Sequence, residues 1–174
     1  KDADWFHFTG ITPAISDKAT LLIEEALKAA KRHNVTVSCD FNYRKKLWSA
    51  EKASRVMTNL MQYVDVCMDG HILLGFKPDS TGVKNGESKL AGYEYVFKQM
   101  VDKFHFKYVV SSLRESYSAS VNGWSGMLYD GKNYYKSKKY DIYIVDRVGG
   151  GDSFCGGLIY GLSSGMDNQT ALEF

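Results

Sequence analysis

The sequence predicts an α/β fold, in which a mainly parallel sheet carries helices on both faces. Strand-like and helix-like segments alternate four times along the 174 residues, and this alternation is typical of βαβ units. Nearer the C-terminal end, a run with two hairpin signals adds antiparallel strands. Strands are predicted at 4–9, 35–40, 64–68, 108–112 and 141–146, and helices at 16–33, 49–63, 88–104 and from about 151 onward.

Two of the predicted helices have a clear starting signal. Ser16 and Ser49 each precede a run with apolar residues at three- and four-residue spacing, and serine is a favoured N-cap because its hydroxyl accepts a hydrogen bond from the first turn. The segment 10–13 contains glycine and proline and is predicted to be a turn. Residues 70–86 are interrupted by several glycines and are predicted to be irregular.

The segment from 117 to 140 changes to an antiparallel pattern. Short alternating runs are separated by Asn122-Gly123 and Asp130-Gly131, and both dipeptides favour hairpin turns. Its lysine- and tyrosine-rich part, 133–140, has the residue types of a nucleic-acid surface, but an edge strand protected by lysines explains them more simply. We therefore expect no nucleic acid as a partner.

The composition is that of a globular chain without a strongly charged partner. Apolar residues make up 44% and charged residues 24%, and the net charge of +2 favours neither nucleic acid nor an acidic surface. No apolar run approaches the roughly 18 residues of a membrane span. The cysteines are widely spaced, which argues against a disulfide framework and for a reducing, cytoplasmic interior. The histidines lack the spacing of metal ligands, so no metal-binding residue is predicted.

The central feature of the sequence is a glycine turn, Gly149-Gly150-Gly151. A β-branched run, 142–145, precedes it and is predicted to be a buried strand, while apolar residues at helical spacing follow it. Glycine lets the backbone approach a ligand closely, and the N–H groups at the start of a helix favour anions. The stretch therefore predicts a phosphate site between a strand and a helix.

Asp152 directly follows the glycine turn, in the first turn of the predicted helix. A carboxylate in a phosphate site repels the anion, so its presence there implies a task. An ionised carboxylate at this position suits a general base, which takes a hydroxyl proton while nearby N–H groups bind the phosphoryl group. An ordinary first-turn aspartate would have the same local sequence, so the stretch alone supports both interpretations.

Three motifs resemble those of one enzyme family. The glycine turn with Asp152 is similar to the Gly-Ala-Gly-Asp signature of ribokinase-like (PfkB-type) carbohydrate kinases, with Gly150 in place of the alanine. The longer string 145–154, the stretch 40–48 (Asp-Phe-Asn-Tyr-Arg-Lys-Lys-Leu-Trp) and the stretch 112–116 (Ser-Leu-Arg-Glu-Ser) resemble bacterial 2-keto-3-deoxygluconate kinases. The motifs occur in the expected order and cover both halves of the chain.

The resemblance implies an ATP-dependent sugar kinase with Mg²⁺ as cofactor. It implies that Asp152 is the general base and that the amides of Gly149, Gly150 and Gly151 bind the transferred γ-phosphate. The favoured substrate is the sugar acid 2-keto-3-deoxygluconate, which would become 2-keto-3-deoxy-6-phosphogluconate. The expected partners are this sugar acid and ATP, and a homo-oligomer is compatible with the resemblance.

Four further residues are candidates for binding. Arg44 and Asn42 follow one strand end, and the resemblance assigns Arg44 to the substrate carboxylate and Asn42 to the junction of substrate and nucleotide. Ser112 and Arg114 come at another strand end. The resemblance assigns both to ATP, with the sugar acid as an alternative contact for Arg114. Because the carboxyl ends of parallel strands meet at one edge of a sheet, these residues can face one crevice with the glycine turn.

The arginines also have simpler interpretations. Arg44 can pair with Asp40, although Asp40 is better explained as a residue that holds its own loop. Arg114 can form a surface ion pair with Glu115. Arg147, near the glycine turn, is a further candidate for binding phosphate, and a surface ion pair is again the simpler interpretation.

The chain departs from the family pattern in two ways. Family members carry an Asn-x-x-Glu motif linked to Mg²⁺ and phosphate, and the corresponding place here reads Met68-Asp69-Gly70-His71. The chain also opens in a strand without Met and stops in the first turn of a helix, so we expect truncation at both ends, with the N-terminal lid and substrate portion and the C-terminal portion missing. Residues 1–174 are predicted to form a single α/β kinase core domain.

Other functions remain open at this point. A kinase of the same fold acting on a neutral sugar, such as fructose or ribose, would not need Arg44 for a carboxylate. A non-catalytic relic that binds a sugar or a nucleotide would show no phosphate transfer dependent on Asp152. The sequence contains no Walker A motif, which excludes a P-loop NTPase, and Phe154 replaces the third glycine of the dinucleotide pattern, which weakens a dehydrogenase.

Overall fold

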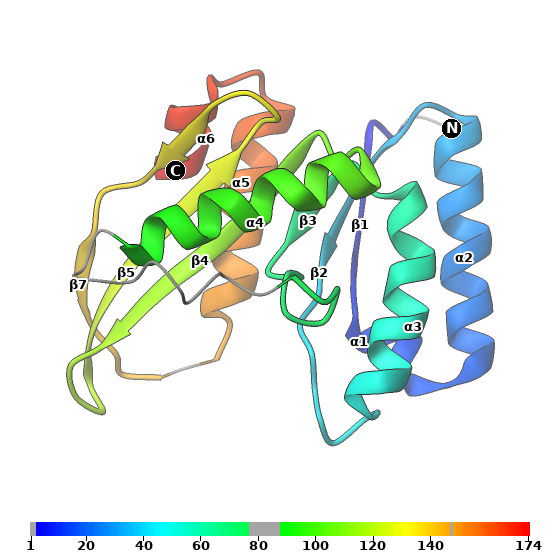
Figure 1. Cartoon of the computed structure of the whole chain (residues 1–174), viewed down its shortest axis with the longest axis horizontal. Helices are drawn as coiled ribbons and strands as arrows, with labels where there is room; N and C mark the ends of the chain where they lie inside the picture. Colours follow the sequence, from blue (N-terminus) through cyan, green and yellow to red (C-terminus); the bar gives the residue numbers. More distant parts are fainter. Residues whose placement is uncertain (1–2, 77–87, 147) are drawn as a thin grey trace. The chain divides into compact units, whose positions relative to one another are not determined.

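The computed structural model describes residues 3–76, 88–146 and 148–174 (Figure 1). The chain divides into two compact units, residues 1–109 and 110–174, and each is described by itself. The prediction of a single core domain stays a prediction. Within the described ranges, no helix has both the length and the apolar character needed to cross a membrane.

The first unit contains a parallel sheet. Strand β1 (Trp5–Thr9) pairs with β2 (Thr36–Asp40), and β2 pairs with β3 (Val66–Met68). The register places Thr9 beside Asp40, so both residues lie at the carboxyl ends of neighbouring strands. Strand β2 is buried over its last four residues, as expected for a parallel strand between two others. The sheet therefore delivers Asp40 to the edge at which the sequence predicts it.

The helices of the first unit are α1 (Ile11–Ile15), α2 (Asp17–Arg32), α3 (Ala50–Leu60), the short 3₁₀ helix η1 (Met61–Tyr63) and α4 (Ser88–Phe104). The three longer ones, α2, α3 and α4, begin where the sequence predicts. The Ser16 hydroxyl accepts a hydrogen bond from the Ala19 N–H at 3.1 Å, and the Ser49 hydroxyl accepts one from the Lys52 N–H at 3.2 Å. Both predicted serine caps are thus confirmed.

Two loop predictions had different outcomes. The segment 10–13 is not a turn, because Ile11–Ile15 form α1 with Pro13 in its first turn. Proline is compatible with that position since the first N–H groups of a helix have no intrahelical acceptor. In the predicted irregular segment, residues 71–75 form a turn, whereas 77–86 lie outside the described residues.

The second unit is built on antiparallel strands. Most of β4 (Tyr108–Ser116) belongs to it, and a short loop leads into β5 (Val121–Tyr129). Strand β5 pairs antiparallel with β6 (Tyr134–Lys136) toward its C-terminal end and with β7 (Tyr140–Tyr143) toward its N-terminal end. Helices α5 (Gly150–Ser163) and α6 (Asn168–Glu173) follow. Together with the parallel strands of the first unit, they confirm the α/β class and its antiparallel segment.

One of the two predicted hairpin turns is correct. The chain turns at Asp130-Gly131, where Gly131 has a φ of 88°. The Asp130 carboxylate accepts hydrogen bonds from the Lys132 and Asn133 N–H groups at 2.9 and 2.7 Å. A short polar side chain that bonds to its own turn is the mechanism behind this sequence signal.

The other predicted turn, Asn122-Gly123, is wrong. Both residues lie inside β5, and the chain reverses at 117–120 instead. There the Ser118 hydroxyl accepts hydrogen bonds from the Ser120 and Val121 N–H groups. The side chain of Asn122 is fully buried and bonds to other residues, so tertiary contacts override the local preference of Asn-Gly.

The strand before the glycine turn is half-exposed rather than buried. Strand β7 ends at Tyr143, and Tyr143 and Val145 are 74% and 94% exposed. Ile142 and Ile144, which alternate with them, line a cavity. The run therefore has the alternation of an antiparallel strand with one covered face, not the two covered faces that its β-branched composition predicted.

Glycine residues let α5 pack closely against its neighbours in the second unit. A Cβ atom at Gly126 of β5 would lie 2.9 Å from the Phe154 ring of α5, and one at Gly161 of α5 would lie 2.8 Å from Ala171 of α6. Leu158 of α5 is 1% exposed. These contacts fix the helix, and with it the glycine turn at its N-terminus.

Candidate active site

Helix α5 begins with an uncapped N-terminus formed by the glycine turn. Gly149 is its N-cap and has φ 81° and ψ 0°, a left-handed conformation that glycine adopts without strain. No side chain of the described residues caps the helix, and the Ser153 N–H donates to the Gly149 carbonyl at 2.8 Å. The N–H groups of Gly150, Gly151 and Asp152 therefore have no acceptor within the helix. Such groups at a helix N-terminus can bind an anion.

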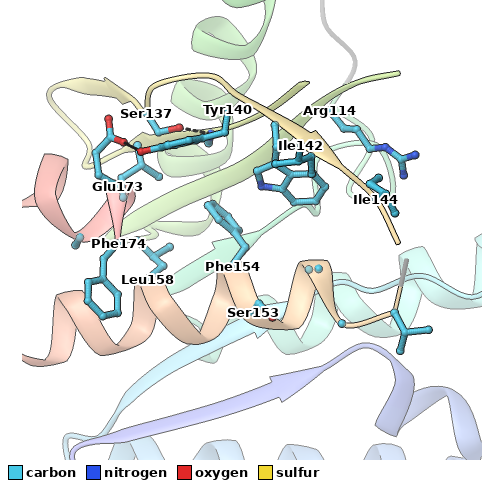
Figure 2. A pocket seen from close by; sticks show the side chains of 18 of the residues that line it. Arg114, Ser137, Tyr140, Ile142, Ile144, Ser153, Phe154, Leu158, Glu173 and Phe174 are labelled. Carbon is cyan, nitrogen blue, oxygen red and sulfur yellow. Dashed lines mark hydrogen bonds between the residues drawn. The ribbon is translucent and has the colours of Figure 1, made fainter. Parts of the chain in front are cut away.

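The glycine turn borders a cavity of about 630 Å³ within the second unit. Figure 2 shows Phe154 and Leu158 of α5 on one side of the cavity and Ile142 of β7 on the other, with Arg114 at one end. The cavity is therefore apolar along its body and polar where Arg114 and the glycine turn border it. The other residues that line it are Trp124, Gly126, Ser137, Tyr140, Ile144, Asp146, Val148, Ser153, Ala171, Leu172, Glu173 and Phe174.

Asp152 lies in the first turn of α5 with its side chain exposed. It is not among the residues that line the cavity, although Gly151 and Ser153 on either side of it are. Within the described part of the chain, its carboxylate takes part in no hydrogen bond or ion pair. Asp152 thus carries an exposed carboxylate that has no partner among the described residues and lies beside N–H groups without an acceptor in the helix, so it is available to accept a proton.

Arg114 extends from β4 to the cavity and is held by a buried side chain. Its Nε–H donates to Oδ1 of Asn122 at 2.8 Å. Among the described residues it forms no ion pair, and the neighbouring Glu115 instead accepts bonds from Lys139 at 2.8 Å and from the Tyr117 hydroxyl at 3.0 Å. The alternative in which Arg114 pairs with Glu115 is therefore not observed.

Ser112, the other ATP-binding candidate in β4, is half-buried. It is absent from the cavity lining, in contrast to Arg114 two residues later. Of the two ATP-binding candidates in β4, Arg114 therefore borders this cavity and Ser112 does not. Arg147, the further phosphate candidate, lies outside the described residues.

The first unit holds the remaining candidates in the loop after β2. Asp40 is 8% exposed, and its carboxylate accepts a hydrogen bond from the Asn42 N–H at 3.0 Å, while Asn42 has a φ of 35°. Asp40 therefore holds its own loop, as predicted. Arg44 is exposed and donates to the Tyr43 carbonyl at 3.4 Å. It forms no ion pair with Asp40 or any other described residue, so its charge is available. That Arg44, Asn42 and the glycine turn share one crevice stays a prediction.

Three residues of the second unit that contribute to the site were not identified as site residues from the sequence. Asn122 was taken for a turn residue, although it orients Arg114. The indole of Trp124 would lie 4.0 Å from a Cβ atom at Gly150. Asp146 lines the cavity and accepts a hydrogen bond from the Val148 N–H at 3.2 Å. Only Asp146 had a sequence signal, namely its position three residues before Gly149, at the end of the predicted strand.

The described residues contain no preformed metal cage, because no group of three or more His, Cys, Asp or Glu side chains is arranged to hold an ion. His71, at the place of the missing Asn-x-x-Glu motif, is buried, and this burial lowers the pKa of its imidazole. Mg²⁺ in phosphate sites is usually held by one or two carboxylates together with the phosphates. Asp146 is a carboxylate at the cavity wall. The cavity therefore fits Mg²⁺ that is bound by Asp146 and by the phosphates of ATP.

No protein-family model matches the chain, but the known proteins to which it is similar are sugar kinases. The chain is 29% identical over 178 residues to the 2-dehydro-3-deoxygalactonokinase of Haloferax volcanii, a match that covers 100% of this chain and 49% of that protein. It resembles the crystal structure of the 2-dehydro-3-deoxygluconokinase of Thermotoga maritima with a TM-score of 0.87 and 45% identity, over 98% of this chain and 52% of that one. The chain thus spans about half the length of the curated relatives it matches.

A more distant neighbour adds information on the fold alone. It is an Escherichia coli Ribokinase II structure in complex with ATP and Mg²⁺, matched with a TM-score of 0.70 and 21% identity over 98% of this chain and 49% of that one. The names of the Haloferax volcanii and Thermotoga maritima relatives contain the term 2-dehydro-3-deoxy, which is a synonym of 2-keto-3-deoxy. This is the substrate class that the motifs indicate. The resemblance predicted from the motifs is therefore confirmed: this chain is related to the ribokinase-like (PfkB-type) carbohydrate kinases and is similar to the 2-keto-3-deoxygluconate kinases among them.

Proposed function

We propose that the protein containing this chain transfers the γ-phosphoryl group of ATP to the sugar acid 2-keto-3-deoxygluconate, giving 2-keto-3-deoxy-6-phosphogluconate. One observation carries the proposal. The unpaired N–H groups of the glycine turn lie directly beside Asp152, whose exposed carboxylate has no partner among the described residues. An anion site and a free base next to each other are what phosphoryl transfer to a hydroxyl requires.

Asp152 is the general base in this proposal. Its carboxylate takes the proton of the 6-hydroxyl group as the hydroxyl oxygen bonds to the γ-phosphorus. The bond from the γ-phosphorus to the bridging oxygen breaks, and its electron pair leaves with ADP. A positioned general base contributes a factor of roughly 10² to 10⁴ to the rate.

The backbone of the glycine turn stabilises the transferred group. Of the three amides assigned to the γ-phosphate, those of Gly150 and Gly151 lie in the first turn of α5, and Gly149 precedes them as the N-cap. Because α5 is anchored through Leu158, these amides need not reorganise during the reaction. One such donor is typically worth a factor of about 10² to 10³ in kcat. When bound, Mg²⁺ shares the negative charge of the phosphates, and Asp146 is the cavity carboxylate suited to hold it.

In the second unit, Arg114 and Ser112 are assigned to ATP together with Gly149 and Gly151. In the first unit, Asn42 keeps the nucleotide assignment that the resemblance implies. In favour of Arg114 are its position at the cavity and its lack of an ion pair among the described residues. For Ser112 and Asn42 the support is the family resemblance.

Arg44 is assigned to the substrate carboxylate, with Asn42 beside it. Its guanidinium is exposed and unpaired within the described residues, and an arginine fork binds a carboxylate bidentately. The two named relatives act on 2-keto-3-deoxy acids of the gluconate and galactonate series. Both substrates carry a carboxylate and differ in the configuration of a hydroxyl group. A sugar acid therefore has stronger support than a neutral sugar, and the ATP requirement favours a cytoplasmic location.

The test is ADP release by the intact protein with Mg-ATP, measured with 2-keto-3-deoxygluconate, 2-keto-3-deoxygalactonate, gluconate, fructose and ribose. We expect the highest kcat/KM with one of the two 2-keto-3-deoxy acids. Turnover with fructose or ribose alone would show that the substrate is a neutral sugar and that the assignment of a sugar acid is wrong. Binding of ATP without turnover on any of the five would support the non-catalytic relic and overturn the proposed activity.

A further inference from the structure

Asn122 of β5 has an unusual environment for an amide. Its side chain is fully buried, yet Nδ2 has no hydrogen-bond partner among the described residues. Oδ1 accepts two hydrogen bonds, from Arg114 Nε at 2.8 Å and from Ser116 Oγ at 2.9 Å. A buried polar atom without a partner destabilises the folded state, so an amide at this position is unfavourable for stability alone.

The orientation of the amide follows from its partners. The Nε–H of Arg114 can only donate, so it must face an acceptor. A rotated amide would place Nδ2 against it, with two donors in contact. Oδ1 is therefore directed toward Arg114, and the lack of a partner for Nδ2 follows from that arrangement.

The bond to Asn122 fixes the plane of the Arg114 guanidinium. The group is rigid and planar, so holding Nε also orients both Nη groups. Neither Nη group has a partner among the described residues, and Arg114 lines the same cavity as the glycine turn. An exposed arginine without such a bond loses rotamer freedom when it binds an anion. The hydrogen bond to Asn122 already restricts the Arg114 side chain before an anion binds.

We propose that Asn122 is a positioning residue that holds the Arg114 guanidinium ready to bind a phosphate group of the nucleotide at the glycine turn. The inference rests on the proposed function, because it takes the anion at this site to be the phosphate of ATP. It adds a residue that contacts no ligand and acts through Arg114. It also gives a role to the buried asparagine of β5, whose Nδ2 has no partner among the described residues.

The test is a double-mutant cycle of Asn122→Ala and Arg114→Ala in the intact protein. The readout is the Kd for a non-hydrolysable ATP analogue with Mg²⁺, measured by calorimetric titration, so that catalysis is not required. We expect Asn122→Ala to raise the Kd about tenfold, as the loss of one well-placed hydrogen bond to a charged group does. In the Arg114→Ala background the same change should alter the Kd less than twofold, since the group it positions is gone.

Ser116→Ala provides the matched control. It removes the second donor to Asn122 and leaves the Arg114–Asn122 bond in place, so we expect a Kd change of less than twofold. A direct readout is the NMR signal of the Arg114 Nε–H, which should be protected from exchange in the wild type and in Ser116→Ala and lost in Asn122→Ala. This readout is independent of nucleotide binding.

Several outcomes would overturn the proposal. An equal effect of Asn122→Ala with and without Arg114 would mean a general structural role for Asn122. Loss of the Nε–H protection without a change in Kd would mean that the orientation does not serve the nucleotide. Nucleotide binding without turnover on any sugar would refute the proposed reaction and leave this proposal standing, whereas absence of nucleotide binding in the wild type would refute both.

Discussion

The N–H of Ser153 donates to the carbonyl of Gly149 at 2.8 Å, and this bond closes the first turn of α5. Gly149 accepts it in a left-handed conformation, with φ 81°. The N–H groups between the two residues are consequently left without an acceptor in the helix. Anion binding at the proposed site depends on this turn.

Gly149→Ala should destabilise the protein because alanine is strained at positive φ. The cost is expected to be about 1–2 kcal/mol. Gly150→Ala is the matched control: a Cβ there meets nothing nearer than the Trp124 indole at 4.0 Å, an ordinary contact, so we expect a change within about 0.5 kcal/mol. Urea unfolding of the intact protein measures both. Equal effects of the two variants would contradict the geometry assigned to Gly149.

Asp152→Asn should reduce kcat by roughly 10²- to 10⁴-fold because the amide cannot accept the hydroxyl proton. ATP affinity should change little, since Asp152 does not line the cavity. Coupled ADP release and calorimetric titration give the two quantities. Asp141→Asn, an equivalent change at an exposed residue of β7, should leave kcat within twofold. If Asp152→Asn retains wild-type turnover, Asp152 is not the base.

Arg44→Ala should raise the KM for the sugar acid about tenfold or more, because a charge-assisted hydrogen bond is lost. Stability should change by less than about 0.5 kcal/mol, since Arg44 is exposed and contacts its neighbour only through a 3.4 Å bond. Lys46→Ala removes a nearby exposed charge and serves as control. The assignment fails if the two variants give the same KM, or if the preferred substrate proves to be neutral.

Two glycines of α5 should respond oppositely to alanine. A Cβ at Gly161 would lie 2.8 Å from the Ala171 backbone, so Gly161→Ala must displace α6 and should cost about 1–3 kcal/mol. A Cβ at Gly156 meets nothing within 4 Å, and alanine there should stabilise the helix by about 0.5–1 kcal/mol. Thermal unfolding of the intact protein distinguishes them. A stabilising Gly161→Ala would be inconsistent with the α5–α6 packing.

Local signals were sufficient for much of the fold. The caps at Ser16 and Ser49 and the turn at Asp130 could be predicted because a side chain bonds to the backbone within three residues. Asn122 could not, because its partner Arg114 reaches it through the pairing of β4 with β5. The run 142–145 was predicted to be buried, but Tyr143 is exposed. Which face of this strand is covered depends on its pairing in the sheet, and the local sequence does not contain that information.

The candidate site was predictable to a similar extent. The glycine turn and Asp152 are contiguous, so a strand-to-helix pattern was enough to identify them. The hydrogen bond of Arg114 to Asn122, its lack of an ion pair among the described residues, and the role of Asp40 in its loop all depend on which partners fold nearby. From the sequence alone, ion pairs with Glu115 and Asp40 were open alternatives, and the structure removes both among the described residues.

The most direct measurement is identification of the phosphorylated product by ³¹P NMR after the intact protein has been incubated with Mg-ATP and 2-keto-3-deoxygluconate. We predict a new phosphomonoester on the 6-carbon of the sugar acid, formed by the wild type and not by Asp152→Asn. A product formed equally by both proteins, or phosphate transferred only to fructose or ribose, would contradict a sugar-acid kinase that uses Asp152 as its base.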